Sequence, residues 1–443
     1  MSGMGEFGWA VHPEAERLVV ELLDEAVACS PRLAALAGRL LLDTSTRLID
    51  WLDHVGGPVP AEHLQAAGFA DGYRTRPGLW RHPGAQLPAV VPGETYAVAL
   101  RVDDAAAFAA AQGATAGVGG SPLSGFRSAT VSGADEAVVV AGVERRSWGR
   151  GVEPQVFSDP ETLSALEAWR LWAERPRGLD GADGVERTLA IAGQMLAAVG
   201  PDLAGSYVLE IERRYWQRRN TAAVIQHARQ DRLGLGWGNN DHHTFRSSRA
   251  AFGPLVRLFV TLGFAPRERF YAGAEAGWGA QVLEHPGTGG VIFADVDLEP
   301  DEVGVDFAAV PLPDAGGLGT VGLWCALHGE SVLAAGMHHL EGQFDFDRLR
   351  HDLDGLGVGH MKPFSDFPHL RQAFTEAERW PVAPERLAKL VAAGHLDART
   401  AEEFAARGAA GSHLENLARR GGFKGFNQHN VSLTMRATDP RRY

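Results

Sequence analysis

Apolar residues recur every three to four positions in two neighbouring stretches near the start of the chain. This spacing, with Ser30 as an N-cap and Pro31 in the turn that follows, predicts two helices between Pro13 and Val55. Further along, Asp159 and the proline after it mark the start of a second helical region, which we expect to continue to about residue 230. The N-terminal half is therefore predicted to be helical at both ends, with strands between.

Strand-like and helix-like patterns alternate along the rest of the chain. β-branched and apolar runs predict strands, and amphipathic runs predict helices. Two strand–helix–strand units of similar size, one on each side of residue 150, are candidates for diverged copies of one module, and the C-terminal half is expected to be α+β or α/β. The expected strands are 96–102, 137–143, 241–246, 290–298, 319–326 and 337–343, and the expected helices are 250–263, 346–356 and 384–393.

The composition narrows the classes of function. The 443 residues include 55 acidic and 42 basic ones, and the formal charge of −13 argues against binding to nucleic acid or to an anionic membrane. No stretch approaches the roughly 18 apolar residues that a membrane span requires, and we expect no secretory leader. Because Cys29 and Cys325 are the only cysteines, a disulfide framework is excluded and a reducing cytoplasm is the expected location.

The stretch from Asp241 to Arg246 is the richest in candidate chemistry. On a strand, His242, Thr244 and Arg246 would share one face, because side chains alternate with a period of two. An imidazole and a guanidinium on one face can hold a metal ion and an acid next to each other. This segment is therefore a candidate for both a metal ligand and a substrate anchor.

Two further segments offer partners for that imidazole. His338 and His339 form a second histidine pair, and Glu415 lies in a third segment. Two histidines and one carboxylate make the facial triad of non-haem Fe(II) sites, which leaves the other positions open for a chelating substrate and dioxygen. The three candidates would come from separate strands.

Each candidate also has an ordinary structural interpretation. Histidines are more often surface or hydrogen-bonded core residues than ligands, an arginine such as Arg246 is most often a salt-bridge partner, and the segment around Glu415 could equally be the solvated face of a helix. Glu341, two residues after His339 and on the same strand face, is a rival or neighbouring ligand. The other rivals are His285, Asp295, Asp297 and His429.

The order of these motifs resembles the iron-dependent 2-oxoadipate dioxygenase/decarboxylase family, also called hydroxyglutarate synthases. The resemblance covers about residues 230–443, and the chain departs from the family at Glu341, where threonine is expected, and at Asn416 and Leu417. The matching segments are 241–246, 258–264, 338–341, 344–347, 357–358, 370–374 and 415–419, and the family's C-terminal pocket loop corresponds to 423–431.

This resemblance implies a vicinal-oxygen-chelate-like α+β fold, in which a curved β-sheet or half-barrel encloses a metal site and extensive helices are added. Residues 1–230 lie outside the match and are expected to form an N-terminal helical and α/β region. The sequence leaves open whether this region covers the barrel mouth, forms a degenerate module packed on the barrel, or mediates oligomerisation. Residues 231–443 would form the metal-binding catalytic domain.

The resemblance also implies the site and the reaction. His242, His339 and Glu415 would bind Fe(II), and Arg246 would hold a substrate carboxylate through a charge-assisted pair. With O2, a 2-oxo dicarboxylic acid such as 2-oxoadipate would become 2-hydroxyglutarate and CO2. A small 2-oxo acid and O2 are thus the expected partners, with no nucleic acid or membrane, and the sequence does not indicate an oligomeric state.

Two alternatives stay open at this point. The segment Gly422–Asn427 resembles the C-terminal segment of 4-hydroxyphenylpyruvate dioxygenase, which implies an aromatic 2-oxo acid as substrate. The histidine clusters could instead belong to a non-catalytic metal-binding protein. Oxygen uptake that depends on a 2-oxo acid would separate these alternatives.

Overall fold

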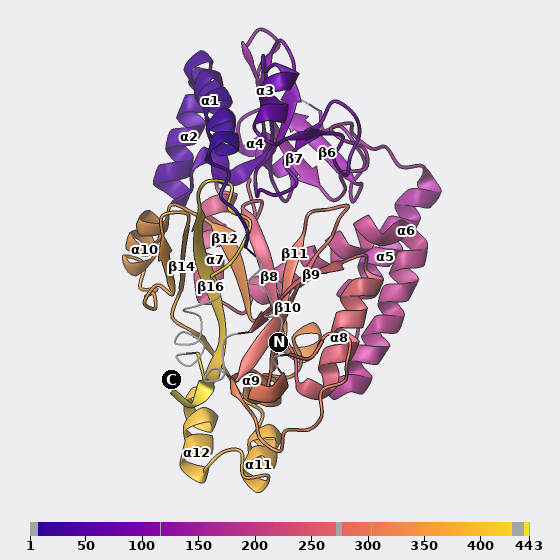
Figure 1. The fold of residues 1–443 in the computed structure, drawn as a ribbon, viewed down its shortest axis with the longest axis vertical. Helices are drawn as coiled ribbons and strands as arrows, with labels where there is room; N and C mark the ends of the chain where they lie inside the picture. The colour runs from indigo at the N-terminus through magenta and orange to yellow at the C-terminus, as the bar shows by residue number, and fades with distance from the viewer. Residues whose placement is uncertain (1–7, 116, 272–276, 303, 428–437, 443) are drawn as a thin grey trace.

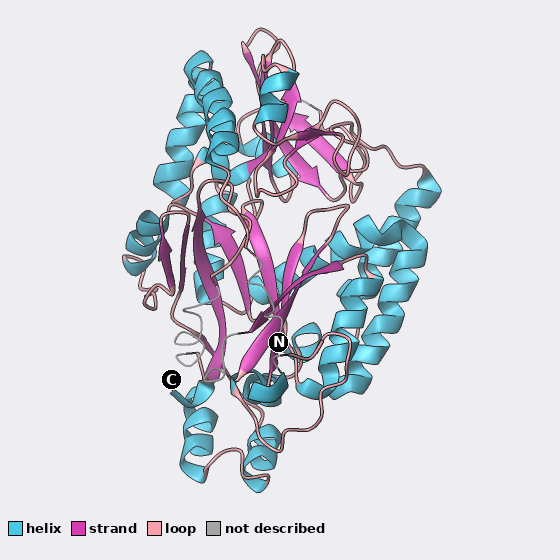
Figure 2. Ribbon diagram, in the orientation of Figure 1, coloured by secondary structure: helices cyan, strands magenta, loops and turns pink. Residues whose placement is uncertain are grey.

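The computed structural model describes residues 8–115, 117–271, 277–302, 304–427 and 438–442 (Figure 1). The chain forms an N-terminal and a C-terminal β-sheet, with helices packed around both (Figure 2). In the view of Figure 1 the N-terminal sheet lies above the C-terminal sheet. This arrangement confirms the expected α+β fold class.

The N-terminal sheet has seven strands within the described residues, in the order β2-β3-β4-β1-β5-β7-β6. β1 runs parallel to β4, β5 runs parallel to β7, and β1 and β5 pair antiparallel at the centre. The strands are β1 (Leu52–Gly57), β2 (Ala70–Asp71), β3 (Trp80–Arg81), β4 (Ala89–Pro92), β5 (Tyr96–Arg101), β6 (Phe126–Thr130) and β7 (Val138–Arg145), and the helices are α1 (Pro13–Cys29), α2 (Pro31–Thr44), η1 (Leu48–Trp51), α3 (Ala61–Ala66) and α4 (Ala105–Ala111).

The C-terminal sheet follows the order β13-β14-β16-β12-β8-β11-β10-β9, and β15 pairs with β16 beside this path. Its strands are β8 (Asn240–Arg246), β9 (Ala265–Tyr271), β10 (Trp278–Glu284), β11 (Val291–Asp297), β12 (His339–Gln343), β13 (Ser365–Phe367), β14 (Leu370–Phe374), β15 (Glu378–Trp380) and β16 (Ala409–Arg419). The helices and helical turns are α5 (Asp159–Ala173), α6 (Gly181–Gln217), α7 (Thr221–Asp231), α8 (Arg249–Thr261), η2 (Pro300–Glu302), α9 (Thr320–His328), η3 (Ser331–Ala335), α10 (Phe346–Asp354), α11 (Pro384–Ala392), α12 (Ala398–Arg407) and η4 (Pro440–Arg442).

A unit of one strand, a helix and three more strands occurs twice along the main path of the C-terminal sheet, and in the second unit β15, α11 and α12 are inserted before the last strand. In the first unit β8 and β11 are parallel neighbours, and in the second β12 and β16 are. The two units meet where β8 and β12 pair antiparallel. This topology is that of the expected half-barrel, and it puts β8, β12 and β16 side by side.

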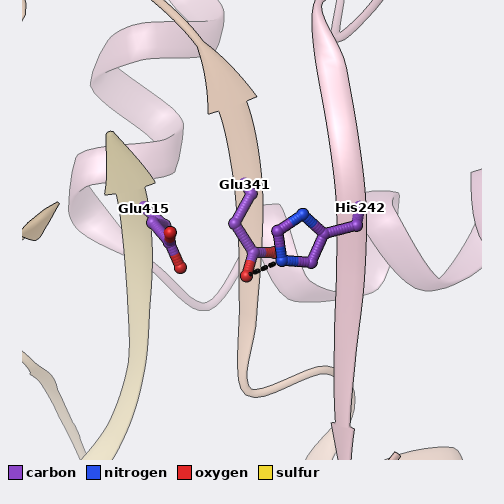
Figure 3. A group of neighbouring side chains, drawn as sticks. All are labelled: His242, Glu341 and Glu415. Atoms are coloured by element: carbon purple, nitrogen blue, oxygen red, sulfur yellow. Dashed lines mark ion pairs between the residues drawn. The ribbon is translucent and has the colours of Figure 1, made fainter. Parts of the chain in front are cut away.

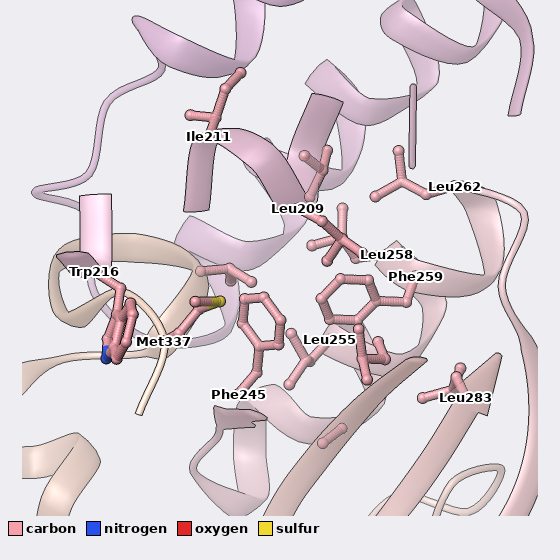
Figure 4. Packing of buried hydrophobic residues seen from close by; sticks show 14 of the residues in the cluster. Leu209, Ile211, Trp216, Phe245, Leu255, Leu258, Phe259, Leu262, Leu283 and Met337 are labelled. Carbon is pink, nitrogen blue, oxygen red and sulfur yellow. The ribbon is translucent and has the colours of Figure 1, made fainter. Parts of the chain in front are cut away.

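Helices α5 to α8 pack against the C-terminal sheet (Figure 1). One hydrophobic cluster runs from Ala165 on α5 to Leu414 on β16, and Figure 4 shows its centre, where Phe245 of β8 meets Leu255 and Phe259 of α8. The N-terminal sheet has a separate cluster. The division after residue 230 stays a prediction, although this packing groups α5, α6 and α7 with the C-terminal sheet.

The expected strand at 319–326 is wrong, because this segment forms helix α9. Eight of its nine residues are buried, so the helix is apolar on every side and lacks the periodicity that identifies a helix in a sequence. The carboxylate of Asp297 accepts hydrogen bonds from the backbone N–H groups of Val321 (2.9 Å) and Gly322 (2.8 Å) and so caps the first turn. A distant residue therefore fixes this helix.

The second N-terminal helix is also shorter than expected. α2 ends at Thr44, since Ser45 adopts a left-handed conformation (φ 57°), and residues up to Val55 form η1 and most of β1. The helical prediction was therefore wrong beyond residue 44. The remaining predicted strands and helices are confirmed within a few residues.

A search of the described helices finds none that combines the length and the apolar character needed to cross a membrane.

Gly238 lies at the contact between the two sheets, just before β8. A Cβ on this residue would lie 1.9 Å from the backbone oxygen of Arg101, at the end of β5. We expect Gly238→Ala to lower the free energy of unfolding by about 3 kcal/mol or more, because backbone must move to admit the methyl group. Gly38→Ala in α2, where nothing lies within 4 Å, should instead stabilise by about 0.5–1 kcal/mol. Urea unfolding of both variants measures the contrast, and equal midpoints would contradict it.

Candidate metal centre

Three neighbouring strands bring the central side chains together. The register pairs Glu341 on β12 with His242 on β8 and with Glu415 on β16, so the three residues form one row across the sheet. Figure 3 shows the three side chains turned toward one another. Their donor atoms all lie within 4.8 Å of one another, which is close enough to bind a single cation.

His242 presents its Nε2 atom to this row. Its Nδ1 lies 2.9 Å from a carboxylate oxygen of Asp241, which in turn accepts two hydrogen bonds from Arg419 (2.8 and 2.9 Å), while Nε2 contacts Glu341 Oε1. Burial lowers the pKa of His242 to about 4, so the imidazole is neutral at neutral pH. A neutral imidazole oriented by a carboxylate is the usual form of a metal-binding histidine.

His339 lies beside the row, on the same face of β12 as Glu341. Its Nε2 atom is 2.8 Å from Glu341 Oε1 and 3.6 Å from Glu415 Oε2. Its Nδ1 atom is 2.6 Å from Nδ1 of His338. His339 is therefore placed to add a second imidazole to the group.

The two carboxylates are buried and carry raised pKa values. Burial raises the pKa of Glu415 to about 7, and burial together with the neighbouring Glu415 raises that of Glu341 well above its usual value. Gln372 donates a hydrogen bond of 2.7 Å to Glu415 Oε1. Two negative charges in one buried site are costly unless a proton or a cation compensates them, so this set of donors fits a divalent metal ion.

The cavity at the row is small and largely aromatic. The cavity and its opening to solvent together hold about 460 Å³ of space, and in the described part of the chain no lysine or arginine lines it. The ring of His242 packs against Phe293 and Phe426, with centroids 4.8 and 4.7 Å apart. The aromatic lining residues are Phe270, Trp278, Phe293, Phe364, Phe374 and Phe426.

Arg246 lies further along the same face of β8 and is fully buried. Its Nε atom is 3.9 Å from Asp295 Oδ2, and its guanidinium carbon is 5.7 Å from the ring centre of Trp324. Asp295 lines the cavity, and burial raises its pKa to about 7. Arg246 therefore sits next to the cavity, behind the residues that line it.

Of the rivals, Asp295 lines the cavity, whereas His285 and Asp297 lie elsewhere. The ring of His285 is held by backbone groups, with Nε2 3.1 Å from the Leu262 oxygen and 3.2 Å from the Pro201 oxygen. Asp297 caps α9, whereas His429 and part of the expected pocket loop 423–431 lie outside the described residues.

The structure therefore brings His242, His339 and Glu415 together and adds Glu341 between them. Glu415 lies on a strand whose neighbours are buried on both faces, so the interpretation of its segment as a solvated helix face is wrong. The roles of Asp241, Arg419 and Gln372 were not recognised in the sequence. The one available signal was the position of Asp241 next to a histidine.

Comparisons with known proteins give only distant likenesses. No protein-family model and no curated protein matches the sequence. A mutant of 4-hydroxymandelate synthase from Streptomyces coelicolor is 13% identical, with a TM-score of 0.31 and coverage of 89% of this chain and 99% of that one. The Mn(II)-bound glyoxalase from Novosphingobium aromaticivorans is 9% identical, with a TM-score of 0.20 and coverage of 86% and 87%.

A third likeness is the uncharacterized protein YdcJ from Shigella flexneri, which includes domain DUF1338. It is 15% identical, with a TM-score of 0.24 and coverage of 54% of this chain and 73% of that one. Likenesses at this level do not assign the chain to a family.

Removal of one imidazole tests the centre directly. We expect His242→Ala to lower the affinity for Mn(II) or Fe(II) at least about 100-fold, because loss of a mere supporting partner already costs 10- to 100-fold. His227→Ala on α7, which removes a histidine that pairs with Asp231 far from the row, is the matched control. Anaerobic titration calorimetry and metal analysis give the affinity and stoichiometry. Equal metal binding by both variants would remove His242 from the site.

Proposed function

We propose that this chain is a non-haem Fe(II)-dependent dioxygenase that oxidatively decarboxylates a 2-oxo acid. The observation that carries the proposal is the meeting of His242, His339, Glu341 and Glu415 at one buried cavity. Mixed imidazole and carboxylate donors suit Fe(II). A largely aromatic cavity with a few converging polar groups also suits a small organic substrate.

In this proposal His242, His339 and Glu415 hold the ion, and Glu341 lies beside it. An ion held by three protein ligands would keep room for a chelating 2-oxo acid and for O2, whereas a fourth protein ligand would leave less. Bound Fe(II) would act as a Lewis acid toward the 2-oxo acid and supply electrons to O2.

The proposed overall reaction consumes one O2 for each substrate: RCH2COCOOH and O2 give RCH(OH)COOH and CO2. The chain's own residues orient and shield the reactants. Asp241 holds the Nδ1 side of His242, so that Nε2 faces the cavity, and Gln372 fixes Glu415 through Oε1. Glu341 Oε1 lies within hydrogen-bond reach of both imidazoles, where it can hold a proton.

The lining of the cavity favours an aromatic side chain on the 2-oxo acid. Six aromatic residues form its walls, and an arylpyruvate would bury its ring against them. A second carboxylate at the same place would meet no cationic partner among the described lining residues, at a high cost in desolvation. We therefore infer that an arylpyruvate is the preferred class of substrate.

A 2-oxo dicarboxylic acid such as 2-oxoadipate is the second candidate. Arg246 favours it, because this guanidinium is buried on the metal-facing side of β8, next to the cavity residue Asp295. A pair between Arg246 and a distal carboxylate would require Asp295 to be protonated or displaced. Its pKa of about 7 makes the protonated form accessible near neutral pH.

We also infer that the N-terminal sheet is a degenerate copy of the C-terminal one. In β1 and β5 the register pairs His54 with Ala99, as His242 pairs with Glu341, and Ala99 in turn pairs with Ala141 on β7. The two carboxylate positions of the row are thus alanines in this copy. It retains the imidazole and lacks the other donors of the row.

Oxygen consumption tests the reaction and the substrate class together. With Fe(II) bound, we expect one O2 consumed and one CO2 released per arylpyruvate, and kcat/KM for 2-oxoadipate at least about 100-fold lower, because a buried carboxylate without a partner is this costly. Arg246→Met should leave KM for the arylpyruvate unchanged. If 2-oxoadipate is instead the better substrate and Arg246→Met raises its KM at least about 100-fold, the second candidate is correct. Full metal loading without substrate-dependent O2 uptake would contradict both.

Glu341→Gln tests the count of ligands. If Glu341 lies beside the ion, the variant keeps metal affinity within about 10-fold of the wild type, whereas Glu415→Gln loses at least about 100-fold. Matched titrations of the two isosteric variants with Fe(II) measure this difference. An equal loss in both would show four protein ligands, which leave too few open positions for the proposed reaction.

A further inference from the structure

A second cavity lies where the two sheets meet. It is open to solvent, holds about 1160 Å³ of space, and shares no lining residue with the metal cavity. Residues from both ends of the chain form its walls, from β1, β3 and β5 on one side to β8, β12 and β16 on the other. Its basic lining residues are Arg47, Arg74, Arg81, Arg101, Arg419 and Lys424.

The acidic residues in this lining already have partners. Glu16 accepts a hydrogen bond of 2.8 Å from the backbone N–H of Gly421. The other three belong to close ion pairs, so little of their charge remains for the other arginines. These pairs are Asp53 with Arg145 (2.6 Å), Asp50 with Arg47 (2.5 Å) and Glu284 with Lys424 (2.8 Å).

Arg81 and Arg101 are left without a close acid. Among the described residues Arg81 forms no ion pair, and the nearest carboxylate oxygen to Arg101 Nε belongs to Asp53 at 4.0 Å. Arg81 Nη1, Arg101 Nε and Trp148 Nε1 are buried nitrogen atoms that find no acceptor in the described chain. All three atoms are hydrogen-bond donors, so a ligand that carries hydrogen-bond acceptors would give them partners.

The guanidinium groups are also held in place. Those of Arg81 and Arg145 stack on Trp148, with their central carbons 4.5 and 3.7 Å from the ring centre. Burial and the nearby charge of Arg145 lower the pKa of Arg81 to about 10, so the positive charge is crowded here. A negative ligand would relieve this repulsion, and the stacked groups would need little reorganisation to bind it.

We propose that this cavity binds a small oxyanion, a phosphate or a carboxylate group, between Arg81, Arg101 and Trp148. The ligand would join the two sheets, because Arg81 and Arg101 belong to the N-terminal sheet and Arg419 lines the opposite wall on β16. Arg419 also holds Asp241, the partner of His242. The oxyanion site would therefore adjoin the support of the metal centre.

Titration calorimetry of the full-length, metal-loaded protein tests this proposal. The probes are inorganic phosphate and glutarate, each in chloride buffer of constant ionic strength. We expect saturable binding of at least one probe, and the better of the two identifies the class of oxyanion. Arg81→Gln and Arg101→Gln should each weaken it about 10-fold or more, since each removes a charged hydrogen-bond donor. Arg76→Gln, which removes an exposed arginine outside the lining, is the matched control and should bind like the wild type.

Thermal unfolding shows whether a variant loses binding only because it is misfolded. In chloride buffer Arg81→Gln should unfold at the wild-type temperature or above it, because it removes a buried charge that has no partner. The stabilisation by the bound probe should be smaller in Arg81→Gln than in the wild type, and it should be unchanged in Arg76→Gln. Absence of saturable binding of both probes, or equal binding by the wild type and both cavity variants, would overturn the proposal.

Discussion

Two imidazoles and two carboxylates meet in one cavity lined by aromatic rings. The burial of the two carboxylates next to each other is the constraint on which the rest of the C-terminal sheet depends. Neither Glu341 nor Glu415 can be ionised there at low cost unless positive charge enters the site. The supporting residues supply hydrogen bonds rather than full charge compensation: Gln372 fixes Glu415, and Asp241 is itself neutralised by Arg419. A cation would therefore stabilise the ionised form of both carboxylates, and this is why we assign the site to a metal ion.

The register of three strands delivers these groups to one place. β12 lies between β8 and β16, and a shift of one residue in either pairing would turn Glu341 or its partners to the other side of the sheet. The repeated unit explains why β8 and β12 are neighbours, because each is the first strand of its unit and the two units meet there. β15 lies beside the main path of this sheet and pairs with the first part of β16, from Ala409 to Ser412, so the strand continues past it to the row.

The sequence alone predicts those parts in which local pattern and final structure agree. His242 and Arg246 were assigned to one strand face because their spacing follows the period of two, and the neighbouring helix α8 follows from its amphipathic pattern. The segment of α9 has no such pattern, since Asp297 from a distant strand caps it and protein surrounds it on all sides. Glu341 was recognised as a neighbour of His339, whereas its place between the two other donors depends on strand pairing, which no local pattern encodes.

In the N-terminal copy that we infer, the ion pair that supports the histidine is present and the carboxylates of the row are not. Asp53 precedes His54 and accepts two hydrogen bonds from Arg145 at the end of β7, as Asp241 precedes His242 and accepts two from Arg419 at the end of β16. Loss of either partner of a buried ion pair leaves a buried charge without compensation, whereas replacement of a ligand carboxylate by alanine removes a buried charge. The pair of aspartate and arginine can therefore persist after the ligand carboxylates are lost. Ala99 and Ala141 occupy the two carboxylate positions of the inferred copy, whereas the ion pair of Asp53 with Arg145 is retained beside them.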